Sequence, residues 1–314
     1  MGVRMKKARD RLQKDRIVTR EQCERGYRGE FICEKCLAPV VFVARYEKRY
    51  YEKIVEVPSF FRLMPNRSHA GNCSFDTVGC VRSIARDSDS AVERSIVHGK
   101  WTFSLQILHQ QSSEDSRETG EGDADPSLEK RKDKVVNNSG TAIDYITTLH
   151  QILSLRAQMD DITDLSACLT LKYGKKKIPW KRFYFEVDTY IDAFDLLHER
   201  KASHQHPICV QGVVKDIRRP TDNFEFYSVK LYSPWTEEGD TVKEVPSVEI
   251  NCPPDIMNKT LTKGAYVLTY GLAKTKIGNK ILPRDGDIPL QFLDIKFWIN
   301  HPDQILVMNS EDAL

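Results

Sequence analysis

The sequence predicts an α+β protein made of an N-terminal zinc-binding module, a helical adaptor and a C-terminal β-barrel. Three observations support this expectation. Paired cysteine and histidine residues lie near the N-terminus, a polar segment interrupts the middle of the chain, and short apolar runs separated by turn residues fill the C-terminal third. We therefore divide the chain at these features, into residues 1–110, 111–140, 141–206 and 207–314.

The composition allows buried cores but does not by itself identify a partner. The chain has 314 residues, of which 40% are apolar and 29% are charged, and its formal net charge is +2. This small total hides an uneven distribution, because lysine and arginine are in excess in the first hundred residues whereas residues 113–126 are acidic. We expect the basic start, residues 1–22, to form a helix or an arm.

The sequence favours a cytoplasmic protein that does not enter a membrane. No run approaches the roughly 20 apolar residues of a transmembrane helix. The first residues, MGVRMKKARDRLQKDR, are charged and lack the apolar centre of a secretory signal. In a reducing compartment, the clustering of five of the eight cysteines in the first 80 residues favours metal binding over disulfides.

Two short-spaced pairs form the candidate metal site. Cys33 and Cys36 make a C-x2-C pair, and His69 and Cys73 make an H-x3-C pair. Each pair offers two ligands from one turn, and thiolate and imidazole ligands at a closed four-ligand site are typical of structural zinc. The alternative is a set of buried free cysteines beside an unrelated histidine. Cys23 and Cys80 are the substitutes if one ligand is misassigned.

The order of these residues resembles the N-terminal zinc-finger region of CoiA-like competence proteins over about residues 28–75. In that family a similar cysteine pair precedes a segment that ends in a histidine and a further cysteine. The resemblance implies a zinc module associated with DNA handling. The nuclease domain that follows in that family is not implied, because the spaced Asp and Glu-x-Lys signature of such a nuclease is missing from this sequence.

The middle of the chain predicts a linker followed by the helical adaptor. Residues 111–140 contain few large apolar side chains and are rich in Ser, Gly, Asp and Glu, which favours a flexible acidic linker. Apolar residues at helical spacing predict helices over 141–158 and 186–200. Between them we expect a strand over 167–173 and a lysine-rich turn over 174–177.

The C-terminal part resembles an OB-fold, a small five-stranded barrel. Alternating apolar runs predict five strands, and residues 254–261 predict a short helical insert between the third and the fourth. Gly212, in the first strand, favours the bend that a small barrel needs. The five predicted strands cover residues 207–217, 224–234, 247–253, 265–275 and 290–299.

Basic and aromatic residues in the adaptor and the barrel are candidates for contacts with nucleic acid. Lysines and arginines bind phosphates, and exposed aromatic rings stack on bases. Phe224 and Phe226 are further candidates for stacking. The alternative is that the aromatic residues fill the core and the lysines are only solvated. The predicted contact residues are Lys175, Lys176, Lys177, Trp180, Lys181, Arg182, Lys215, Arg218, Arg219, Tyr227 and Lys230.

No familiar catalytic motif occurs in the sequence. Phosphate-binding glycine loops, the G-x-S-x-G elbow, the kinase motifs and H-E-x-x-H are all missing. We therefore expect a non-catalytic, zinc-containing protein that binds nucleic acid, with single-stranded DNA as the favoured form. Two alternatives remain open. One is a protein–protein adaptor subunit of a bacterial defence or mobile-element assembly, and the other is a cryptic metal-dependent nuclease.

Overall fold

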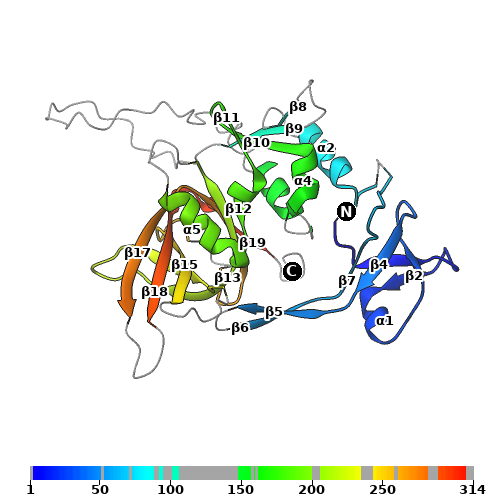
Figure 1. Cartoon of the computed structure of the whole chain (residues 1–314), viewed down its shortest axis with the longest axis horizontal. Coiled ribbons are helices and arrows are strands. Elements are labelled where there is room, and N and C mark those ends of the chain that lie inside the picture. The colour runs from blue at the N-terminus through cyan, green and yellow to red at the C-terminus, as the bar shows by residue number, and fades with distance from the viewer. Residues whose placement is uncertain are drawn as a thin grey trace.

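The protein is mostly β, with few and short helices (Figure 1). In this computed structural model the described residues are 3–50, 53–70, 73–87, 92–94, 101–105, 148–156, 159, 162–199, 206–234, 243–257, 261–281 and 289–308. The predicted linker, 111–140, lies outside these residues. None of the helices within them has the length and the apolar character that a membrane span requires.

The N-terminal part is an antiparallel five-stranded sheet of order β2-β1-β3-β4-β7. A short helix, α1 (Arg20–Glu24), begins at the N-cap Thr19, whose hydroxyl accepts a hydrogen bond from the backbone N–H of Gln22. The strands are β1 (Lys7–Asp10), β2 (Ile17–Thr19), β3 (Phe31–Ile32), β4 (Pro39–Val43) and β7 (Phe60–Leu63).

The expected basic helix or arm at residues 1–22 is therefore wrong, because β1 and β2 form a hairpin within this sheet. The reason is a period-two pattern of burial, in which Ala8 and Asp10 are buried and their neighbours Lys7 and Arg9 are more exposed. Ala8 and Val18 are paired across the hairpin and fully buried, while Lys7 points to solvent. The high local charge obscured this alternation.

A separate two-stranded hairpin extends from the five-stranded sheet toward the C-terminal part (Figure 1). Its strands are β5 (Tyr46–Tyr50) and β6 (Lys53–Val57). Lys48 on β5 forms ion pairs with Glu186, at 3.5 Å, and with Asp188, at 2.9 Å. The hairpin thus connects the two ends of the molecule.

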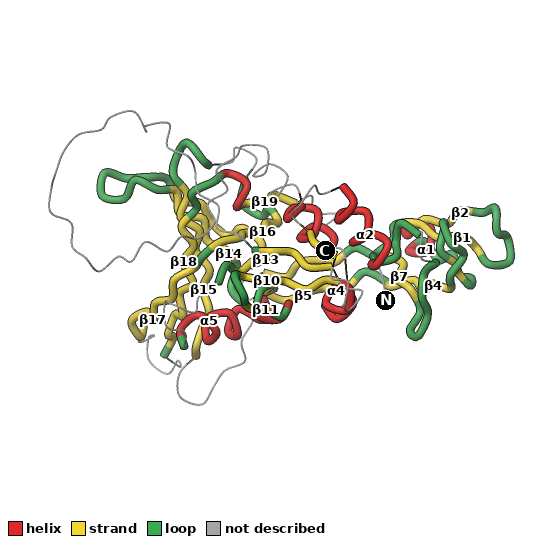
Figure 2. Tube along the Cα trace, turned by 90° about the horizontal axis from the view of Figure 1, so that it is seen from above, coloured by secondary structure: helices red, strands yellow, loops and turns green. Residues whose placement is uncertain are grey.

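A four-stranded sheet of order β11-β10-β9-β8 joins segments on both sides of residues 111–140. Strand β9 pairs in parallel with β10, placing Phe103 beside Leu171. Helices α2 (Thr77–Asp87) and α4 (Ile162–Cys168) pack against strands of this sheet (Figure 2). Its strands are β8 (Val92–Arg94), β9 (Trp101–Ser104), β10 (Leu169–Tyr173) and β11 (Lys176–Ile178).

The predicted helices of the adaptor are present where the structure describes them. Residues 148–156 are helical, within the expected 141–158. Helix α5 (Tyr190–His198) follows the 3-10 helix η2 (Val187–Thr189), within the expected 186–200. A second 3-10 helix, η1 (Trp180–Arg182), follows the lysine-rich turn at Gly174, whose φ of +58° favours glycine.

The C-terminal sheet has eight strands in the order β17-β18-β15-β14-β13-β16-β19, with β12 paired to β13. Helix α5 packs against it, and the hydroxyl of Tyr190 lies too close to Gly212 to leave room for a Cβ atom. The strands are β12 (Tyr184–Phe185), β13 (Ile208–Arg218), β14 (Tyr227–Leu231), β15 (Lys243–Cys252), β16 (Tyr266–Gly271), β17 (Ala273–Ile281), β18 (Leu290–Trp298) and β19 (Ile305–Met308).

The expected closed OB-like barrel is wrong, since no sheet within the described residues closes into a barrel. The predicted strand 265–275 is two strands, β16 and β17, which pair with different partners. Strand β15 pairs in parallel with β18, and the path ends at β17 and β19. In the expected helical insert, the described residues 254–257 form a turn.

Candidate metal centre

The first two ligands lie on a tight turn between β3 and β4. The Cys33 N–H donates to the carbonyl of Ala38 at 2.7 Å, and the N–H of Leu37 donates back to the carbonyl of Cys33 at 3.1 Å. Leu37 adopts a φ of 62°, which allows the chain to reverse after Cys36. The turn directs both thiols to one side, and the N–H of Lys35 lies 3.5 Å from the sulfur of Cys33.

The other two ligands lie on the segment between β7 and α2. The Cys73 N–H donates to the carbonyl of Ala70 at 2.8 Å, and the N–H of Phe75 points to the sulfur of Cys73 at 3.5 Å. Backbone N–H groups therefore face a sulfur in both ligand pairs. Such donors stabilise a thiolate.

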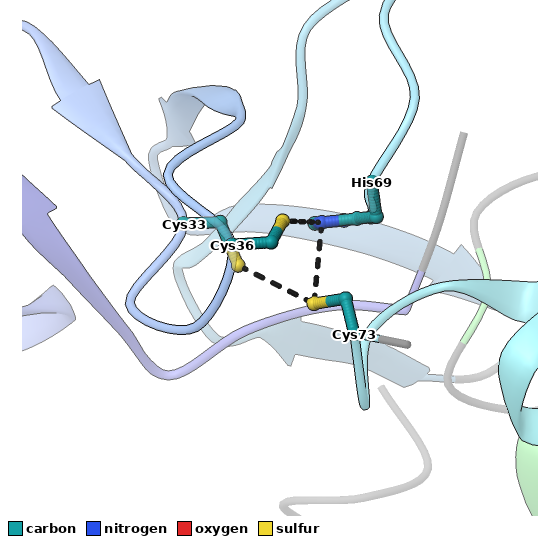
Figure 3. Close-up of side chains that lie close together, drawn as sticks. All are labelled: Cys33, Cys36, His69 and Cys73. Atoms are coloured by element: carbon teal, nitrogen blue, oxygen red, sulfur yellow. Dashed lines mark hydrogen bonds between the residues drawn. The ribbon is translucent and has the colours of Figure 1, made fainter. Parts of the chain in front are cut away.

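The four side chains converge, with all ligand atoms within 4.8 Å of one another (Figure 3). The sulfurs of Cys33 and Cys73 are 3.8 Å apart. Nδ1 of His69 is 3.2 Å from the sulfur of Cys36 and 3.6 Å from that of Cys73. Zinc bonds of about 2.0–2.3 Å in a tetrahedron place ligand atoms about 3.5–3.8 Å apart, so these residues fit a zinc ion.

Burial affects the ionisation of all four side chains. It raises the pKa of Cys73 to about 12 and also raises the pKa of Cys33, so both are neutral thiols at pH 7 without a metal. Burial opposes ionisation of Cys36 too, but hydrogen bonds from the backbone N–H groups of Ala70 and Ala38, together with those to the thiols of Cys73 and Cys33, outweigh it and lower the pKa of that thiol. Burial lowers the pKa of His69, which favours the neutral imidazole that binds metal.

The site has the character of a structural zinc centre. Four protein ligands complete a tetrahedron and leave no position for a substrate or a reactive water. Cys33, His69 and Cys73 are all buried. Nε2 of His69 is buried without a hydrogen-bond partner among the described residues, which is consistent with Nδ1 as the metal-binding atom.

The two substitute cysteines lie outside the group. Cys23 is buried in the N-terminal core, and the thiol of Cys80 donates to the carbonyl of Ser74 at 3.1 Å. Within the described ranges no second group of three or more potential metal ligands is present. The carboxylate cluster expected of a two-metal nuclease is therefore not found in that part of the chain.

The sequence matches no protein-family model and no curated protein. The resemblance to the CoiA-like zinc-finger region therefore rests on the order and spacing of the four ligands.

Six of the predicted nucleic-acid contacts lie on or next to β10 and β11. We call residues 169–182 the basic hairpin. Its lysines at 175, 176, 177 and 181 and its arginine at 182 are exposed. Trp180 differs, since its ring is only 3% exposed and its indole N–H donates to the carbonyl of Leu169 at 3.4 Å. Trp180 is therefore a core residue, and its predicted role as a stacking surface is wrong in this conformation.

The remaining predicted contacts lie on β13, on β14 and in the loop between them. Arg218 and Arg219 are exposed, whereas Lys215, Tyr227 and Lys230 are half-buried. Arg218 lies 3.6 Å from the carboxylate of Asp216. These five residues thus lie on or next to the C-terminal sheet, whereas the basic hairpin belongs to the four-stranded sheet. The structure does not gather all predicted contacts on one element.

An exposed aromatic cluster lies in the same region, and one member was missed from the sequence. The ring of Trp298 is 5.1 Å from that of Phe226 and 6.3 Å from that of Phe224. Trp298 and Phe224 are 39% and 37% exposed. Trp298 ends β18 on the solvent side, as the alternation with buried Phe297 indicates. Its neighbours Phe224 and Phe226 come from a loop far away in the sequence, so no local sequence pattern predicts the cluster.

Proposed function

We propose that this protein is a non-catalytic, zinc-stabilised protein that binds nucleic acid and favours single-stranded DNA. The observation that carries the proposal is the basic hairpin. Six lysines and arginines fall within residues 172–182, and no aspartate or glutamate occurs between residues 165 and 185. None of the six forms an ion pair with another described residue.

A phosphate backbone is the ligand that such a surface suits best. Each phosphate neutralised by a lysine or an arginine releases counterions, which makes the binding favourable and dependent on salt. Three consecutive lysines at the end of a two-stranded hairpin place their charges close together, and among the described residues none of them is paired with a charge of the opposite sign. This arrangement costs folding free energy through repulsion, and a polyanion removes that cost.

The exposed aromatic cluster supports the preference for single strands. Bases in a duplex are stacked on one another, whereas those of a single strand are open to stacking on protein rings. Trp298 and Phe224 offer accessible rings of this kind. Arg218, at the end of β13, and Arg219, in the loop that follows, precede Phe224 and would meet phosphates next to a stacked base.

Zinc has a structural role in this proposal. Zinc bound to the four residues would hold the turn after β3 against the segment before α2. In the sequence, the β5–β6 hairpin lies between these two segments. The metal thus fixes the fold of the N-terminal part and takes no part in a reaction.

The test is binding of fluorescently labelled single- and double-stranded oligonucleotides, measured by anisotropy at several salt concentrations. We expect salt-dependent binding that is tighter for the single strand. The variant Lys175→Ala with Lys176→Ala should weaken it, whereas Lys14→Ala with Lys263→Ala, which removes the same charge from two exposed lysines elsewhere, should have a smaller effect. No salt-dependent binding to either form would refute the proposal.

A protein–protein adaptor is the second candidate. The loop that carries Phe224 has charges of both signs, from Arg219, Asp222 and Glu225, next to Arg218 at the end of β13. Exposed aromatic residues bordered by mixed charges are common at protein interfaces. Binding of nucleic acid by the isolated protein distinguishes the two candidates, because an adaptor would bind it only together with its partner.

A further inference from the structure

A cavity of about 320 Å³ lies beside the basic hairpin, between α4, β10, β11 and η1. Leu169, Ile178, Pro179 and Trp180 are among the residues that line it, and its lining is mostly apolar. Thr170, Lys177 and Lys181 also line it. The cavity therefore combines a mostly apolar lining with two lysines among its lining residues.

The pairing of β10 with β11 explains how these groups meet. Lys172 lies opposite Lys177 in the ladder, and side chains alternate between the two faces of the hairpin. Thr170 and Lys177 therefore share one face of the hairpin, and Leu169 and Ile178 share the other. These residues meet because the cavity lies where β10 begins and β11 ends. Lys181 reaches the same opening because Pro179 ends β11 and η1 turns the chain back.

We infer that this cavity receives one nucleotide of the bound strand, with the base against the apolar wall and its phosphate near Lys177 and Lys181. This inference rests on the proposed function and deepens it. Ligand cavities are mostly apolar with a few placed polar groups, and a nucleotide has the matching parts, a flat base and an anionic phosphate. A volume of about 320 Å³ is at the small end of the usual range of about 300–1,000 Å³, so a single nucleotide suits it.

The same geometry selects against a duplex. A base enters a cavity of this kind only when it is unpaired and turned away from its neighbours. Because Trp180 is buried, the base contacts the mostly apolar lining of the cavity and does not stack on an open ring face. The cavity thus adds a second reason for the preference for single strands, independent of the exposed aromatic cluster.

The first part of the test needs no variant. A labelled oligothymidylate of about 12 nucleotides is compared with the same strand in which every second residue is abasic, by fluorescence anisotropy with the full-length protein. Both strands carry the same number of phosphates. We expect the abasic strand to bind about tenfold more weakly, with an unchanged dependence on salt.

The second part uses matched variants. Thr170→Phe fills the cavity without changing the charge and keeps a residue type that strands accept. It should weaken binding of the complete strand about threefold, leave its salt dependence unchanged and reduce the preference for that strand over the abasic one, with the remaining preference due to Trp298 and Phe224. Lys177→Ala should weaken binding about tenfold, and Lys175→Ala, which removes the same charge outside the cavity, about two- to threefold. Thermal unfolding of each variant checks its fold.

The outcomes separate the two proposals. If the protein binds DNA but Thr170→Phe binds it as the unchanged protein does and the two lysine variants behave alike, the nucleotide cavity is overturned and the proposed function stands. If the protein binds no nucleic acid at any salt concentration, both proposals fall. If Thr170→Phe does not fold, the comparison of Lys177→Ala with Lys175→Ala decides the matter, because stacking on Trp298 and Phe224 would also weaken binding of an abasic strand.

Discussion

At the scale of the residue, Asp10 shows how one buried carboxylate organises a turn. Its Oδ1 accepts hydrogen bonds from the backbone N–H groups of Leu12, at 2.8 Å, and Gln13, at 2.9 Å, and its Oδ2 accepts one from the hydroxyl of Tyr27. These hydrogen bonds lower the pKa of Asp10. The one from Tyr27 is the largest cause, and those from the backbone N–H groups follow. The charged carboxylate thereby closes the β1–β2 hairpin.

The lowered pKa gives a prediction with a definite sign. Because the folded pKa lies below the unfolded value of about 3.9, ionised Asp10 stabilises the fold at neutral pH, and this contribution is lost as the pH falls through the folded pKa. Tyr27→Phe removes the main donor, so the pKa of Asp10 should rise toward its ordinary value. An NMR titration of the carboxyl carbon measures this. Tyr46→Phe, at an exposed tyrosine, should leave the pKa of Asp10 unchanged, and the same pKa in all three proteins would contradict the prediction.

Residues differ in how far the sequence reveals them. The four candidate metal ligands could be grouped from the sequence because each pair is closely spaced, and the structure brings the two pairs together in a group that could hold a metal ion. Asp10 and Trp298 could not, since their partners Tyr27 and Phe226 are brought to them by folding. Trp180 was misassigned for the same reason, because a basic neighbourhood in sequence does not show which side of the chain faces the core.

At the scale of the element, Gly212 on β13 permits the close approach of α5. A Cβ atom there would overlap the hydroxyl of Tyr190 and would lie 2.8 Å from Cδ1 of Leu231. The hydroxyl of Tyr190 donates to the carbonyl of Gln211 at 2.8 Å, so it is held in place. From the sequence we expected Gly212 to allow a bend in its strand. In the structure, the missing side chain of Gly212 instead makes room for Tyr190 of α5.

Gly212→Ala should therefore destabilise the C-terminal sheet by about 1–3 kcal/mol, as overpacking of a core does. The expected result is a lower urea midpoint with an unchanged slope. Tyr190→Phe removes the overlapping oxygen, so the double variant should lose less stability than the sum of the two single variants. Additive losses would show that the hydroxyl of Tyr190 is not what excludes a side chain at position 212.

Strands were easier to predict than their pairing. A continuous apolar run located β13, which is buried on both faces over most of its length, and alternation of apolar residues located β18. Both predictions are within one residue at each end. The parallel pairings of β9 with β10 and of β15 with β18 join segments far apart in the chain. Periodicity within a segment carries no information about such partners, so the open sheet was mistaken for a closed barrel.

At the scale of the whole molecule, two hydrophobic cores meet at a narrow connection. One core is built on the five-stranded sheet and includes Cys33 and Cys73, and the other extends from α2 through the C-terminal sheet. Phe75 packs against both. The second connection is polar, where Lys48 on the β5–β6 hairpin meets Glu186, which also accepts a hydrogen bond from the buried Arg156 at 2.9 Å.

This division predicts that metal removal destabilises one core more than the other. The purified protein should contain about one zinc per chain, and calorimetry should show two unfolding transitions, one for each core. A chelator should lower the temperature of one transition and change the other little, because the C-terminal core has no described ligand to the metal. Cys33→Ser with Cys36→Ser should lose the zinc and reproduce this pattern without chelator, while Cys80→Ser, outside the ligand group, should retain the zinc.

A single transition unaffected by chelator would mean that the four residues hold no metal that stabilises the fold. Two transitions that shift together would mean instead that Phe75 and Lys48 couple the cores strongly, so that zinc stabilises the basic hairpin from a distance.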